Sequence, residues 1–113
     1  AGVFRPGSGV KGGGGVDAVL EKLMHRADKE LRRARRKHPQ FAGGNGFEEK
    51  CWPAVLARFR KVFPNTCHED LILEEECLEF LADISSGRRE EAFVEAAQVV
   101  AVVVRMLSEG AGR

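Results

Sequence analysis

The feature that most constrains this chain is a long apolar segment over residues 93–107. Its only polar residues are Glu95, Gln98 and Arg105. On a helix with 3.6 residues per turn these three occupy one sector of about 80°, and apolar side chains cover the rest. Such a helix is expected to be buried almost all round. A carboxylate inside it is costly unless it is paired or binds a metal ion, so the polar sector must face another polar surface.

The valine-rich part of this segment, VVAVVV at 99–104, also suits a buried strand, because β-branched residues favour strands. The length of the segment, its alanines and its continuity with EEAFVEAAQ favour a helix instead. We expect this helix over residues 90–108, with Glu90 and Glu91 in a first turn where the helix dipole favours acids.

Two helices are predicted in the first half of the chain. The first begins at Asp17, a favoured N-cap residue, and runs to Lys37, because His38 precedes a proline. A shorter helix starts near Pro53, a favoured first-turn position, and ends before Pro64.

A third helix is predicted over residues 67–84, since Thr66 and Glu69 have the spacing of a capping box. The sequence Ser85-Ser86-Gly87 then ends it, and so short a turn brings the following helix back antiparallel. The chain is therefore expected to be all-α, with four helices in a single domain over residues 16–113.

Residues 1–15 are dominated by glycine and are predicted to be a flexible tail. A phosphate-binding loop is the weaker alternative, because no GK[ST] sequence follows. The sequence has no run of about 18 apolar residues, so no transmembrane helix is predicted. The three cysteines have no metal-site spacing and are interpreted as reduced thiols of an intracellular, cytoplasmic protein. A net charge of +1 provides no overall field for nucleic acid or membranes.

The third helix carries an acidic flank beside its expected core stripe. Glu76, Glu79 and Asp83 share this flank, and the stripe consists of Leu73, Cys77, Phe80, Leu81 and Ile84. Neighbouring carboxylates repel each other unless a positive charge lies between them, and Mg²⁺ prefers hard oxygen ligands. A solvated acidic face is the alternative interpretation of this helix taken alone.

The antiparallel turn should bring this flank to the polar sector of the fourth helix. Glu76, Glu79, Glu95 and the Gln98 amide oxygen would then converge, with Arg105 one or two turns away. Metal binding is the interpretation that we favour, and the alternative is an ion pair of Arg105 with a carboxylate and no metal.

These residues resemble the MazG-like family of all-α nucleoside triphosphate pyrophosphohydrolases, whose pattern is EExxE, a spacer, then ExxD. The first half matches at 75–79 and the second, imperfectly, at 95–98. The resemblance implies a four-helix MazG-like bundle completed by oligomerisation as a homodimer or homotetramer. It also implies cleavage of a nucleoside triphosphate to the monophosphate and pyrophosphate, dependent on Mg²⁺ or Mn²⁺. We expect this reaction to serve the removal of noncanonical nucleotides.

Carried onto this chain, the resemblance makes Glu76, Glu79 and Glu95 metal ligands, and Glu75 a residue that assists as an outer ligand or orients the attacking water. Gln98 departs from the pattern, which usually has Asp there. An amide ligates through oxygen but brings no charge, so we expect weaker metal binding or fewer bound ions than in the family.

Four residues are candidates for substrate binding. Trp52 can stack on a base, although a core or interface anchor is its more common role. Lys61, Arg88 and Arg105 can meet phosphates, and Arg105 is preferred because its face is expected to be buried. The alternative function is a noncatalytic helical module that contacts nucleic acid or a protein through the basic residues 25–37. A solvated basic face is favoured over nucleic-acid binding, because no aromatic residues alternate with the cations.

Overall fold

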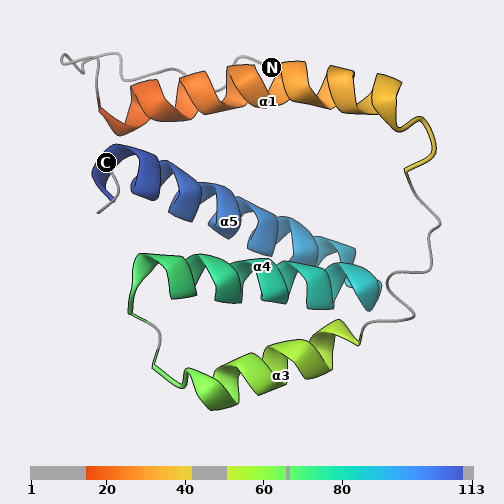
Figure 1. Ribbon diagram of the computed structural model, residues 1–113, viewed down its shortest axis with the longest axis vertical. Coiled ribbons are helices and arrows are strands. Elements are labelled where there is room, and N and C mark those ends of the chain that lie inside the picture. Colours follow the sequence, from red (N-terminus) through yellow and green to blue (C-terminus); the bar gives the residue numbers. More distant parts are fainter. Residues whose placement is uncertain (1–14, 42–50, 66, 111–113) are drawn as a thin grey trace. The chain divides into compact units, whose positions relative to one another are not determined.

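The structure is a computed structural model and describes residues 15–41, 51–65 and 67–110. The chain forms the helices α1 (Val16–Lys37), α3 (Trp52–Val62), α4 (Glu69–Ser85) and α5 (Arg89–Glu109), shown in Figure 1. The described residues contain no strand. The predicted all-α class is therefore confirmed, the part of the chain that the structure describes has the four expected helices, and residues 99–104 are helical.

The helix ends agree with the sequence signals at most positions. Lys37 is the last residue of α1, and Pro53 lies in the first turn of α3. The start of α4 was predicted two residues too early, since His68 is its N-cap and forms no side-chain capping hydrogen bond. Thr66, the expected capping residue, lies outside the described residues.

Contacts divide the chain into two compact units. One unit is Ala1–Gly43 with Val104–Arg113, and the other is Gly44–Val103. In the first unit no residue of α1 is buried. An open pocket of about 410 Å³ is lined there by Val19, Lys22, Leu23, Arg26 and Leu107. Apart from Gly15, the predicted N-terminal tail lies outside the described residues, and the single domain over residues 16–113 stays a prediction.

The core of the second unit lies between α3 and α4. It consists of Leu56 and Phe59 from α3 with Leu78 and Ala82 from α4. On the α4 wheel, Leu78 and Ala82 lie roughly opposite the stripe that the sequence predicted around Leu73. The predicted position of the core was therefore wrong, because α4 lies between α3 and α5 (Figure 1) and carries apolar residues on two opposite faces.

The expectation that α5 is buried almost all round was also wrong. Its buried residues are Ala92 and Val104, whereas Phe93 is 61% exposed and Val94 is 55% exposed. The sequence showed that α5 is apolar on most of its surface, but it could not show which side another element covers. Among the described residues, no helix is long and apolar enough to cross a membrane.

The turn from α4 to α5 explains why the two helices meet. Ser86 is the C-cap of α4, and its backbone N–H donates to the carbonyl oxygens of the last helical turn. Gly87 has a φ of 78°, a conformation that glycine adopts without the steric cost of a Cβ atom. The chain therefore reverses within a few residues, and the first part of α5 runs back antiparallel to α4 (Figure 1).

Candidate metal centre

Three carboxylates converge between α4 and α5. Glu76 and Glu79 come from α4, and Glu95 comes from α5. One oxygen of each lies within 4.8 Å of the oxygens of the other two, and all three side chains are partly buried. Three carboxylate oxygens at such separations can ligate one divalent ion, which would compensate for their mutual repulsion.

The local sequence accounts for this convergence. Glu76 and Glu79 are three residues apart, so they project from one face of α4 as neighbours. This acidic face lies between the two apolar faces of α4 and next to α5. Glu95 lies in the second turn of α5, soon after the reversal at Gly87, and it is thereby brought back beside α4.

The Gln98 amide completes this group on α5. One of its terminal atoms lies 2.8 Å from Glu95 Oε1 and 2.7 Å from Glu76 Oε1. With its NH₂ group turned inward, the amide donates hydrogen bonds to both carboxylates. Rotated by half a turn, it presents its carbonyl oxygen as a fourth oxygen ligand beside the three carboxylates. The amide can therefore serve the cluster both without and with a cation.

Protonation of the cluster follows from its crowding. Partial burial, hydrogen bonding with Glu79 and the negative charge of Glu79 raise the pKa of Glu95 to about 8. The pKa of Glu76 is raised as well, mainly by burial and then by the charge of Glu79. At neutral pH the ion-free cluster therefore retains a proton, which a bound metal ion would displace.

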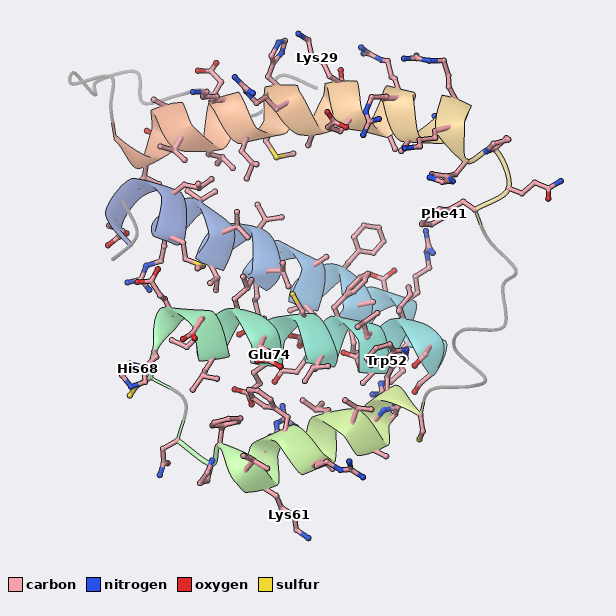
Figure 2. The ribbon with its side chains drawn as sticks, viewed as in Figure 1. Lys29, Phe41, Trp52, Lys61, His68 and Glu74 are labelled. Carbon is pink, nitrogen blue, oxygen red and sulfur yellow. The ribbon has the colours of Figure 1, made fainter. Side chains whose placement is uncertain are left out.

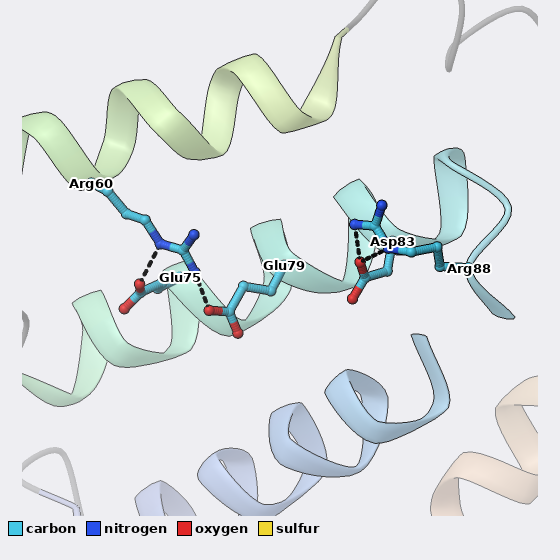
Figure 3. Close-up of polar contacts among 5 residues, drawn as sticks. All are labelled: Arg60, Glu75, Glu79, Asp83 and Arg88. Atoms are coloured by element: carbon cyan, nitrogen blue, oxygen red, sulfur yellow. Dashed lines mark hydrogen bonds and ion pairs between the residues drawn. The ribbon is translucent and has the colours of Figure 1, made fainter. Parts of the chain in front are cut away.

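A cation from α3 reaches the same acidic face. The Arg60 Nε atom donates to Glu75 Oε2 at 2.9 Å, and its terminal N–H group donates to Glu79 Oε2 (Figure 3). Both carboxylates raise the pKa of the Arg60 guanidinium, led by the hydrogen bond to Glu75. Sequence reasoning missed Arg60. The available signal was its position four residues after the core residue Leu56, which puts it at the edge of the face that meets α4.

Trp52 and Lys61 lie at opposite ends of α3. Trp52 is partly buried and packs against the core of the second unit. Figure 2 shows this residue beside α4. This packing is the anchor role that was expected to be the more common one. Lys61 is exposed and points away from α4 (Figure 2).

Arg88 and Arg105, two of the predicted substrate-binding residues, form ion pairs with carboxylates other than those of the cluster. Arg88, in the turn between α4 and α5, donates from Nε to Oδ1 of Asp83 at 2.9 Å, and Asp83 lies in the last turn of α4 (Figure 3). The side chain of Arg105 is 73% exposed, and its ion-pair partner is Glu109, at 3.4 Å. The expected burial of Arg105 was therefore wrong. The carboxylate with which it forms an ion pair is Glu109 of the same helix, and whether the cluster binds a metal stays a prediction.

In comparisons with protein families, curated proteins and solved structures, nothing matches this chain at a significant level. The resemblance to the MazG-like family consequently stays a prediction that depends on residues 75–79 and 95–98.

Proposed function

We propose that this chain is a Mg²⁺-dependent nucleoside triphosphate pyrophosphohydrolase of the MazG-like kind. The observation that supports this proposal best is the convergence of Glu76, Glu79 and Glu95 from two helices within 4.8 Å. The reaction adds water across the anhydride between the α and β phosphates and releases the nucleoside monophosphate and pyrophosphate. Noncanonical or excess nucleotides in the cytoplasm are the substrates that we propose.

In this proposal each residue of the cluster has a defined role. Glu76, Glu79 and Glu95 hold Mg²⁺ or Mn²⁺, and Gln98 turns its amide oxygen toward the ion. When bound, the ion supplies Lewis acidity, which polarises a phosphoryl oxygen and lowers the pKa of bound water. Glu75, the neighbour of Glu76 in α4, orients the attacking water. Trp52, Lys61, Arg88 and Arg105 stay candidates for contacts with the substrate.

A second copy of the chain is part of the same proposal. Phe93, Val94 and Val100 of α5 are exposed apolar residues, and the exposed Ala97 lies between them on the helix surface. Contiguous exposed apolar residues mark interaction sites in many soluble proteins. We propose that this surface, residues 93, 94, 97 and 100, is covered in a homodimer or homotetramer.

Turnover of a nucleotide panel tests the enzymatic proposal. With Mg²⁺ present, the wild-type chain should release pyrophosphate from at least one member of a panel of NTPs and dNTPs. Glu79→Gln should lower that rate at least ~100-fold, because it removes a charged ligand. Glu74→Gln is the matched control, since Glu74 is an exposed glutamate of the same helix, and it should retain the wild-type rate. Release of pyrophosphate that is unaffected by Glu79→Gln would contradict the assignment of the site.

One observation favours a second candidate function. The cations of α1 that lie on one side of the helix span a sector of about 100° and extend along about 22 Å of its axis. They are Lys22, Arg26, Lys29, Arg33, Arg36 and Lys37. An exposed basic stripe of this kind suits contacts with nucleic-acid phosphates. A panel without pyrophosphate release, together with salt-sensitive binding to a DNA or RNA duplex, would favour this noncatalytic function.

A further inference from the structure

The Arg60 guanidinium connects two helices through carboxylates at the candidate metal centre. It extends from α3 to α4 and contacts Glu75 and Glu79 there, as Figure 3 shows. Glu75 and Glu79 are four residues apart on α4, so they are neighbours on one face and repel each other when both are ionised. The guanidinium fork lies against both and compensates for this repulsion.

Glu79 consequently takes part in both groups of side chains. Its Oε2 atom accepts a hydrogen bond from Arg60. The same carboxylate supplies one oxygen to the group formed with Glu76 and Glu95. A carboxylate that is fixed on one side by a charged donor has fewer side-chain conformations available, so its ligating side is oriented before an ion arrives.

Resting on the proposed function, we propose that Arg60 is a positioning residue of the metal centre: anchored also by Glu75, it holds Glu79 in the orientation that binds the divalent ion. The positive charge of Arg60 has the opposite tendency, because it repels a second cation. Its side chain is 49% exposed, so solvent and salt screen this repulsion. Orientation of the carboxylates is therefore expected to outweigh the repulsion.

Calorimetric titration of the intact chain with Mn²⁺ tests this proposal. Arg60→Gln should weaken Mn²⁺ binding and raise its dissociation constant about tenfold, the lower end of the range for residues that orient metal ligands. Arg60→Lys should have an intermediate constant, since an ammonium keeps the charge but cannot contact both carboxylates as a planar fork. Arg58→Gln is the matched control, because Arg58 is an exposed arginine of the same helix, and its constant should stay within about twofold of wild type.

The electron paramagnetic resonance spectrum of bound Mn²⁺ gives a second measurement, because a change of ligand orientation alters the symmetry around the ion. If Arg60 has a purely structural role, Arg60→Gln should lower the melting temperature but leave the Mn²⁺ dissociation constant and spectrum unchanged. That result would overturn the proposal. Tighter Mn²⁺ binding in Arg60→Gln would also overturn it and would make Arg60 a competitor of the metal. If the wild-type chain binds no Mn²⁺, the proposed function fails first, and this inference fails with it.

Discussion

Gln98 decides how much negative charge the cluster can offer to a metal ion. Its amide lies 2.7–2.8 Å from carboxylate oxygens of Glu76 and Glu95. The carboxylate of a glutamate at position 98 would therefore also reach the cluster. An amide can donate to these carboxylates or add a neutral oxygen ligand. A carboxylate at this position would repel the other acids without metal and would strengthen the cluster with metal, because affinity for hard cations rises with the charge of the ligands.

Replacing the amide tests this role directly. A glutamate side chain has nearly the same shape as glutamine, and Gln98→Glu should tighten Mn²⁺ binding, lowering its dissociation constant about tenfold. It should also lower the melting temperature of the ion-free protein, because a further charge is crowded into the cluster. Gln98→Ala, which removes the amide, should bind Mn²⁺ no more tightly than wild type. Equal affinities in wild type, Gln98→Glu and Gln98→Ala would exclude Gln98 from the metal centre.

At the same scale, part of the site was predictable and part was not. Glu76, Glu79 and Glu95 were recognisable because helical spacing and a short turn are local properties of the sequence. Arg60 was not, because its partners lie 15 and 19 residues away and depend on how α3 packs against α4. Arg105 shares a sector with Glu95 on the helical wheel, but its side chain is exposed and pairs with Glu109.

At the scale of the helices, the sequence predicted where most elements begin and end. Proline and glycine are local signals, so Pro39, Pro53 and Gly87 mark boundaries that the structure has. Which helix faces are covered was not predictable, because coverage depends on neighbours that are distant in sequence. The helix α4 is apolar on two opposite faces, and α5 leaves Phe93 and Val94 exposed.

The exposed surface of α5 gives a prediction about assembly. If a second copy covers it, Ala97→Glu would bury a charge without a partner at the centre of the interface, which is strongly unfavourable. Glutamate favours helices, so α5 itself should persist. Light scattering after size exclusion should give a dimeric or larger mass for wild type and a monomeric mass for Ala97→Glu.

The control for this prediction is the same substitution on another helix. Ala57 is an exposed alanine of α3, and Ala57→Glu should keep the wild-type mass. A wild-type chain that is monomeric at about 100 μM, the upper end of the usual working range, would contradict the proposed assembly.

For the whole molecule, the cluster links metal binding, protonation and stability. The pKa of Glu95 is about 8 in the folded chain, compared with an ordinary value of 4.5. The folded state therefore binds a proton that the unfolded state releases between these two values. It follows that the ion-free protein loses stability as pH rises from about 4.5 to 8. A divalent ion that displaces this proton should bind more tightly as pH rises through the same window.

The most direct test of the central claim, that Glu76, Glu79 and Glu95 hold a divalent ion, is calorimetric titration with Mn²⁺ at two pH values. In buffers of different ionisation enthalpy, the wild-type chain should show saturable binding at pH 7 with release of about one proton. Binding should be about tenfold weaker at pH 6, because the proton on Glu95 must be displaced. Glu95→Gln should lose both the proton release and most of the affinity. An absence of binding at millimolar Mn²⁺, or binding that neither pH nor Glu95→Gln changes, would contradict the account.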